Sequence, residues 1–105
     1  MGKVVQSPQQ IDVTEQQFER IEALIKQYIP NTPVWFYGSR VAHTARPNSD
    51  LDMVVFAEPN QRADVSELKE AFEESDLPFR IDLFIWDEIP ESFHANIKKQ
   101  HVVVQ

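Results

Sequence analysis

The sequence predicts an α/β or α+β fold, in which helices pack against a single sheet. Two observations lead to this prediction. Some segments carry apolar residues at helical spacing, whereas others are short runs of strand-forming residues. The two kinds of segment alternate along the chain in the order helix, strand, loop, strand, helix, strand, helix. Such an alternation is typical of a sheet covered by helices.

The first helix is predicted over residues 14–29. Thr14 and Gln17 have the spacing of a capping box, in which each side chain binds the other residue's backbone N–H. Pro30 and Pro33 end the apolar pattern. The apolar residues at helical spacing are Phe18, Ile21, Leu24, Ile25, Tyr28 and Ile29.

Three strands are predicted from short apolar runs bounded by turn-forming residues. They span residues 34–37, 50–56 and 79–86. The first is continuously apolar, which indicates a buried strand, and it ends at Gly38.

Two more helices and a C-terminal segment complete the prediction. Asp64 is the predicted N-cap of the second helix, which residues 75–78 terminate. Pro90 opens the last helix. Residues 101–104, which are largely valine, are predicted to form a short edge strand or a docking tail.

Length and composition limit the classes of function that the protein can have. The 105 residues fit one small domain, which we place at residues 12–105 after a flexible lead-in at 1–11. The formal charge of -7 argues against non-specific nucleic-acid binding. The absence of cysteine excludes thiolate metal sites and suits a cytoplasmic protein. No apolar run approaches the length of a membrane span, so no membrane association is expected.

Two acidic residues begin the second predicted strand. Side chains alternate between the faces of a strand, so Asp50 and Asp52 are predicted to project from one face and Leu51 from the other. In the third strand, Asp82 falls on an equivalent face and joins the pair if the two strands are neighbours. Oxygen ligands without His or Cys favour Mg²⁺, or Mn²⁺, over zinc. The alternatives are a solvated strand face and, for Asp82, a surface salt bridge to Arg80.

Gly38 and Ser39 supply the features of a phosphate site. Gly allows a ligand to approach the backbone closely, and Ser39 offers a hydroxyl and an N–H group. A helix starting at Ser39 or Arg40 would add free N–H groups that attract an anion. For the Arg40 side chain, phosphate binding and a purely structural role at the helix surface both remain open.

Gly38-Ser39, ten intervening residues and then Asp50-Leu51-Asp52 resemble the signature of the DNA polymerase β-type nucleotidyltransferase superfamily. The string GSRVAHTARPNSDLDMVVF resembles the minimal nucleotidyltransferase (MNT) branch, and the likeness covers roughly residues 12–100. The resemblance implies a nucleotidyltransferase fold with a short mixed sheet. It also implies that Ser39 holds a nucleotide phosphate, that Asp50 and Asp52 bind Mg²⁺, and that Asp82 binds metal and activates an acceptor hydroxyl.

The resemblance further implies a reaction and a partner. The reaction would transfer a nucleoside monophosphate, AMP from ATP, to a hydroxyl acceptor. MNT proteins are often encoded beside a small helical HEPN protein, which completes the site or serves as the acceptor, so a hetero-oligomer is expected. Larger relatives bind the acceptor with a second helical domain that 105 residues do not accommodate. Two alternatives stay open: an antitoxin that neutralises a HEPN toxin mainly by contact, and a small-molecule nucleotidyltransferase.

Overall fold

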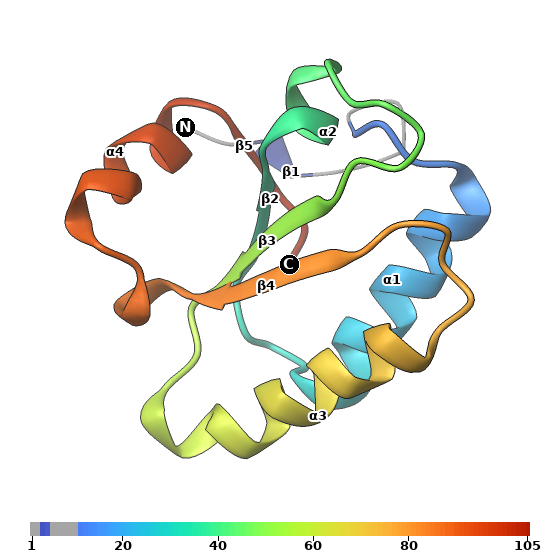
Figure 1. Cartoon of the computed structure of the whole chain (residues 1–105). Helices are drawn as coiled ribbons and strands as arrows, with labels where there is room; N and C mark the ends of the chain where they lie inside the picture. Colours follow the sequence, from blue (N-terminus) through green and yellow to red (C-terminus); the bar gives the residue numbers. More distant parts are fainter. Residues whose placement is uncertain (1–2, 5–10) are drawn as a thin grey trace.

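A twisted, mixed β-sheet forms the centre of the protein (Figure 1). The computed structural model describes residues 3–4 and 11–105, and within these ranges the sheet has five strands. They are β1 (Lys3–Val4), β2 (Val34–Tyr37), β3 (Leu51–Val55), β4 (Ile81–Ile85) and β5 (His101–Val103).

Four α-helices and two 3₁₀ turns connect these strands in the described ranges. Helix α1 precedes β2, the single turn α2 follows it, α3 joins β3 to β4, and α4 joins β4 to β5. The α-helices are α1 (Glu15–Tyr28), α2 (Ser39–Ala42), α3 (Arg62–Glu74) and α4 (Glu91–Lys99), and the 3₁₀ turns are η2 (Pro59–Gln61) and η3 (Trp86–Glu88).

The strand order is β1-β5-β2-β3-β4, so β4 lies at one edge of the described sheet. β2 runs antiparallel to both of its neighbours, whereas β3 and β4 are parallel. The register places Asp52 opposite Tyr37 on one side and opposite Asp82 on the other. The predicted α/β class and the predicted adjacency of the two Asp-bearing strands are therefore both confirmed.

Helix α1 begins as the sequence predicts. The Gln17 N–H donates to Thr14 Oγ1 at 3.1 Å, and the Thr14 N–H donates to Gln17 Oε1 at 2.8 Å. This reciprocal pair satisfies two N–H groups that the helix leaves free. The buried side of the helix carries Phe18, Ile21 and Ile25, which join the core.

Replacing Thr14 with alanine is expected to lower the free energy of unfolding by about 1 kcal/mol. The change removes the side-chain acceptor for the Gln17 N–H and unpairs the capping box. Chemical denaturation monitored by circular dichroism measures the effect. Ser66→Ala, on the exposed side of α3, is the matched control and is expected to change stability by less than about 0.5 kcal/mol. Equal stabilities of the two variants would contradict the assigned cap.

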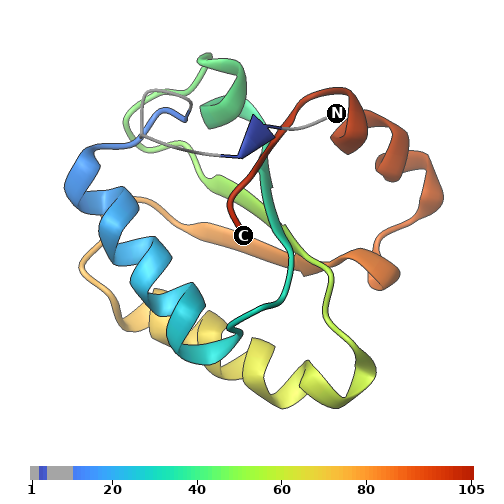
Figure 2. The same ribbon diagram turned by 180° about the vertical axis from the view of Figure 1, so that it is seen from behind.

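The two faces of the sheet are covered unequally. Helices α1 and α3 lie together on one side, and α4 lies on the other (Figures 1 and 2). Leu51, Met53 and Val55 of β3 are fully buried with α1 and α3, as their alternation predicts. Asp52 and Asp82 therefore belong to the opposite face. The main core contains residues from Ile11 to Val102. We propose that residues 12–105 form one domain around this core, as the sequence predicts.

The start of α3 differs from the prediction. Asp64 is not an N-cap: the helix begins at Arg62, directly after η2, and Asp64 lies in its first turn. A capping box between Glu58 and Gln61 organises η2 instead. Pro59 favours this early start because its ring restrains the backbone to helical φ values at the first position of a helix.

The C-terminal segment is a strand, but it is not at the edge. β5 lies between β1 and β2, because Lys3–Val4 pair with Val102 and Val103. The flexible lead-in predicted at 1–11 includes this short strand and Ile11, which is 1% exposed. The remaining positions of that prediction, 1–2 and 5–10, lie outside the described residues.

Candidate functional site

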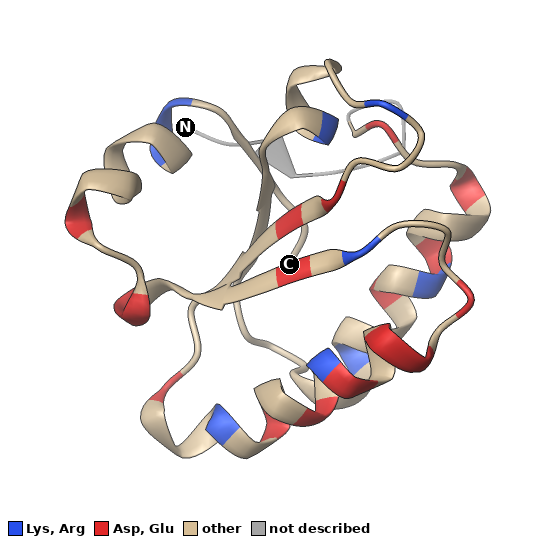
Figure 3. Ribbon diagram, viewed as in Figure 1, with Lys and Arg blue, Asp and Glu red and all other residues tan. Residues whose placement is uncertain are grey.

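Two aspartates meet on the less covered face of the sheet. Asp52 on β3 and Asp82 on β4 are register partners, and both are partly exposed. Figure 3 shows acidic segments side by side on these two strands. Asp50 precedes β3 and is also partly exposed. The strand alternation that buries Leu51 and Met53 thus brings carboxylates from two strands to one place.

The turn at Gly38 lies directly against Asp52. Gly38 has φ 86° and ψ −160°, a backbone conformation that favours glycine. A Cβ atom at this position would overlap the Oδ2 atom of Asp52. Helix α2 starts at the next residue, Ser39, as predicted. The Gly38-Ser39 segment and the first of the two paired carboxylates therefore form one compact unit, in which the backbone of one residue contacts the side chain of the other.

The surroundings of Asp52 disfavour its charged form. Burial and the nearby charges of Asp82 and Asp50 raise the pKa of Asp52 to about 6, in that order of importance. The same causes, burial first and then Asp52 and Asp82, raise the pKa of Tyr37 to about 12. The three carboxylates are therefore close enough to affect one another, and a bound cation would relieve their repulsion.

This donor set fits a hard cation such as Mg²⁺, which prefers oxygen ligands. Within residues 3–4 and 11–105, however, no group of three or more His, Asp or Glu side chains is arranged to hold a metal ion. The carboxylates thus provide only part of a coordination shell. Magnesium usually completes such a shell with water and substrate phosphates.

Comparison with known proteins identifies the family. A family model described as "Polymerase beta, Nucleotidyltransferase" matches residues 19–105. The chain belongs to the polymerase β-type nucleotidyltransferase family. The predicted family and the predicted enzyme class are both confirmed.

Individual relatives of this nucleotidyltransferase agree with the family match. The chain is 39% identical over 97 residues to "Probable protein adenylyltransferase MntA" of Haemophilus influenzae, covering 91% of the chain and 85% of that protein. This relative supports the predicted likeness to the MNT branch.

Two solved structures share the fold. One, described as "Crystal structure of the toxin-antitoxin with AMP-PNP", superimposes with a TM-score of 0.64 at 22% identity and covers 84% of this chain and 72% of that chain. The other, described as "putative nucleotidyltransferase", has a TM-score of 0.51 at 15% identity, with coverages of 85% and 98%. Together they confirm the predicted nucleotidyltransferase fold. Among the described residues, no helix is both long and apolar enough to cross a membrane.

Two residues beside the carboxylates of this nucleotidyltransferase were not predicted as site residues. Tyr37 lies opposite Asp52 in the sheet, where burial and the charges of Asp52 and Asp82 raise the pKa of its hydroxyl still further above neutral pH. Arg80 donates from Nη2 to Asp82 Oδ1 at 2.9 Å, the salt bridge considered above as an alternative role for Asp82. Strand alternation could have predicted the position of Tyr37. This residue shares the less buried face of β2 with Trp35, whereas Phe36 points into the core.

Arg40 is placed differently from the other predicted phosphate-binding residues. Its side chain is only 5% exposed. The guanidinium donates to the backbone carbonyl oxygens of Asp12 (2.7 Å), Pro47 (3.1 Å) and Ser49 (2.8 and 3.0 Å). It also lies 4.0 Å from the ring centre of Phe79. Through these contacts the guanidinium holds the loop between α2 and β3, which leads directly to Asp50.

Replacing Arg40 with alanine is expected to lower the free energy of unfolding by about 3 kcal/mol, because three carbonyl groups lose hydrogen bonds to a buried, charged donor. Arg46→Ala, in the same loop but exposed, is the control and is expected to leave stability unchanged within about 0.5 kcal/mol. Thermal and chemical denaturation measure both. An Arg40→Ala protein with full stability but weakened ATP binding would instead favour the phosphate-binding role.

The far end of the same sheet face is aromatic. Trp35 stacks on His101 at 3.8 Å between ring centres, and Trp86 stacks on His94 at 3.8 Å. His101 comes from β5 and His94 from α4, so the stacks help to hold α4 on this face of the nucleotidyltransferase. Both His side chains bind backbone carbonyls, at Ile97 and Trp86. These contacts give the two tryptophans and the two histidines structural roles.

Proposed function

We propose that this nucleotidyltransferase moves AMP from ATP to a hydroxyl group of a partner protein, in the cytoplasm. The observation that carries the proposal is the contact of the Gly38 turn with Asp52, beside its register partner Asp82. This arrangement offers one place for phosphates and one for the reacting hydroxyl. The similarity to "Probable protein adenylyltransferase MntA" supports adenylyl transfer to protein over other transfers.

In the proposed reaction, the acceptor oxygen attacks the α-phosphorus of ATP. A bond forms between that oxygen and phosphorus, the bond from the α-phosphorus to the bridging oxygen breaks, and pyrophosphate leaves with the electron pair. The acceptor proton passes to the Asp82 carboxylate, which is partly exposed and can meet an incoming group. Ser39 contributes its backbone N–H and hydroxyl to the phosphates at the start of α2. We assign no phosphate contact to the Arg40 side chain.

Asp50 and Asp52, with Asp82, are the proposed ligands of Mg²⁺, and Mn²⁺ would fit the same oxygen donors. When bound, the metal offsets negative charge on the triphosphate and on the departing pyrophosphate. The raised pKa of Asp52 supports this assignment, since burial and then the charges of Asp82 and Asp50 disfavour its ionised form, and a cation would offset both effects.

The proposed acceptor is a small helical protein of the HEPN type, encoded beside this chain, with which it forms a hetero-oligomer. Two observations support this choice. The MNT likeness implies such a partner, and the solved structure with the same fold belongs to a toxin–antitoxin pair crystallised with AMP-PNP.

The test is to incubate the purified chain with the product of its neighbouring gene, ATP and Mg²⁺, and to measure the intact mass of that partner. We expect an increase of one or more AMP units, lost with Asp52→Asn and absent with an ATP analogue in which a methylene group replaces the oxygen that bridges the α- and β-phosphates. An unmodified partner that is still inhibited in a stable complex would contradict transfer. It would favour the second candidate, an antitoxin that acts by binding, which the toxin–antitoxin neighbour also supports.

A further inference from the structure

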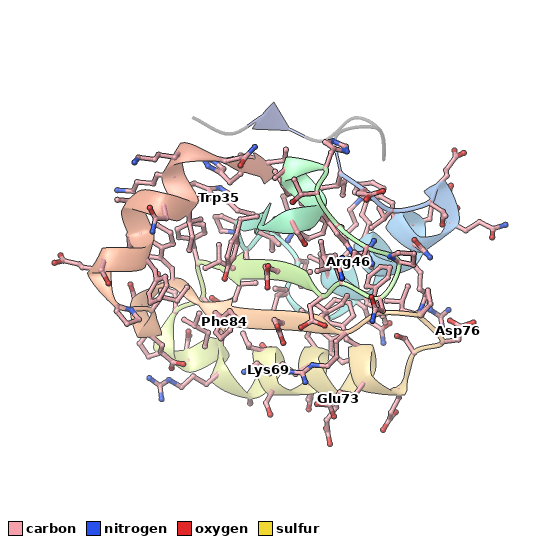
Figure 4. All side chains as sticks on the ribbon, turned by 45° about the horizontal axis from the view of Figure 1, so that its top comes forward. Trp35, Arg46, Lys69, Glu73, Asp76 and Phe84 are labelled. Carbon is pink, nitrogen blue, oxygen red and sulfur yellow. The ribbon has the colours of Figure 1, made fainter. Side chains whose placement is uncertain are left out.

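A groove of about 910 Å³ runs between strand β4 and helix α3. Lys69, Phe72 and Glu73 of α3 line one wall, and residues 81–84 of β4 line the other. Figure 4 shows Phe84 on β4 above Lys69 and Glu73 on α3. We call this feature the β4–α3 groove.

Strand β4 presents unpaired backbone groups to this groove. In the described sheet it has one neighbour, β3, with which it runs parallel. The Leu51 N–H donates to the Arg80 carbonyl oxygen, so the alternate residues Arg80, Asp82 and Phe84 direct their backbone groups at β3. The N–H and C=O groups of Ile81, Leu83 and Ile85 therefore point away from β3, toward the open edge.

The groove is continuous with the proposed reaction site. Asp50 and Asp82 line it, together with the β4 edge. Phe84, two residues after Asp82 on the same face, is 46% exposed, which is unusual for a large apolar side chain. An occupant of the groove would thus meet hydrogen-bonding groups, an apolar surface and the proposed proton acceptor along one line.

We propose that the acceptor enters this groove as an extended peptide segment that pairs with β4 as an added strand. The proposal rests on the proposed function and specifies how its protein acceptor is bound. An extended peptide is the occupant that satisfies a row of free backbone donors and acceptors, and strand addition to an open sheet edge is a known mode of peptide recognition. A folded helix would leave the backbone groups of Leu83 without partners.

The register of an added strand places the reacting group. Side chains directly opposite each other on neighbouring strands have Cβ atoms about 5 Å apart. A serine, threonine or tyrosine opposite Asp82 projects to the same face as this carboxylate, and the residue two positions away lies beside Phe84. The acceptor motif is therefore a hydroxyl residue with an apolar residue two positions from it. The hydroxyl oxygen bonds to the α-phosphorus, its proton moves to Asp82, and pyrophosphate leaves.

The probe is a library of nine-residue peptides with Ser, Thr or Tyr at the centre. Two measurements are made with the full chain: amide hydrogen exchange by NMR with each peptide pool, and peptide mass after incubation with ATP and Mg²⁺. We expect selected peptides to protect the amides of Ile81 and Leu83. At 100 times the dissociation constant, exchange slows roughly 100-fold. The same peptides gain one AMP unit.

Peptide analogues test the strand geometry directly. An antiparallel or parallel added strand directs only alternate N–H groups at β4. Methylating the peptide nitrogens of one alternate set is expected to abolish amide protection and lower labelling more than roughly tenfold, whereas methylating the other set leaves both nearly unchanged. Equal effects of the two sets would overturn strand pairing.

Matched variants test the groove from the enzyme's side. Glu73→Trp fills the groove, whereas Glu70→Trp makes the same change on another side of α3, in a hollow shared with Arg20 and Leu24. We expect Glu73→Trp alone to weaken peptide labelling, roughly tenfold or more, with unchanged binding of a non-hydrolysable ATP analogue. Weakening by both variants, or by neither, would argue against the groove.

The outcomes separate the two proposals. Peptides that protect Ile81 and Leu83 without any AMP transfer to peptide or protein support the edge site and overturn the proposed function. Transfer to a folded partner with no peptide protecting β4 supports the proposed function and overturns the edge site. Protection that depends only on the concentration of the chain itself would show pairing of two β4 edges, which also overturns the peptide assignment.

Discussion

Asp52→Asn is expected to reduce nucleotidyl transfer roughly 10³-fold without unfolding the protein. Asn has nearly the shape of Asp, so the contact with the Gly38 turn is retained. What is lost is a charge that is half-buried beside Asp82 and Asp50 and that we assign to Mg²⁺ binding. The effect is expected in the rate of transfer and in the Mg²⁺ dependence of ATP binding, measured by AMP incorporation and by calorimetry.

The same substitution is expected to raise stability at neutral pH. The folded-state pKa of Asp52 is raised from 3.8 to about 6, so the folded state binds this proton more tightly than the unfolded state does. This carboxyl therefore favours folding below pH 3.8, and that contribution is lost as the pH rises toward 6. After allowance for solvent screening, Asn is expected to gain about 1 kcal/mol at pH 7 and to weaken the pH dependence between these values.

Thermal denaturation from pH 4 to pH 8 measures this effect, without added Mg²⁺. Asp76→Asn, which is exposed on the loop after α3, serves as the control and is expected to keep both the transfer rate and the pH dependence of the native protein. A less stable Asp52→Asn protein at pH 7 would show that the charged Asp52 carboxylate has a favourable partner. Transfer at the native rate would show that Asp52 is not required for the reaction.

Gly38→Ala is expected to lower the free energy of unfolding by about 3 kcal/mol. It is also expected to lower the rate of nucleotidyl transfer roughly 100-fold or more. Two costs combine. Alanine is strained at φ 86°, and its Cβ would overlap Asp52 Oδ2. The structure can relieve the overlap only by moving the carboxylate or the start of α2, and both are parts of the proposed donor site.

A double-mutant cycle with Asp52→Ala separates the two costs. Removing the carboxylate removes the overlap but leaves the backbone strain, so Gly38→Ala should destabilise the Asp52→Ala protein less than it destabilises the native one. Chemical denaturation of the four proteins gives the coupling. Strictly additive effects would mean that the overlap contributes nothing and that the backbone conformation alone requires glycine.

Much of this site follows from strand alternation. Asp50, Leu51 and Asp52 alternate in exposure as the period of a strand requires, and parallel pairing with β4 then brings Asp82 to Asp52. The capping residues of α1 and the start of α2 at Ser39 could also be predicted from the sequence, because local hydrogen bonds determine them.

Other features depend on contacts between distant residues. In the sequence, Arg40 is a cation beside a predicted phosphate motif. In the structure, its guanidinium donates instead to the carbonyl oxygen of Asp12, 28 positions away, and to carbonyl oxygens of the loop that follows α2. Local patterns contain no signal for that partnership. The position of β5 was missed for a similar reason: its neighbour β1 has only two residues, Lys3–Val4, too few for a periodic pattern.

The inner position of β5 has a consequence for synthesis. It is the last element in chain order, yet it flanks β2, the strand that leads to Gly38. During translation, residues 101–105 leave the ribosome after every candidate site residue has already emerged. β2 therefore gains its second neighbour only at that point, and Gln105 then binds the carbonyl groups of Ile29 and Thr32 ahead of β2. A nascent chain that stops before His101 would contain the whole signature, but β2 would lack its pairing with β5.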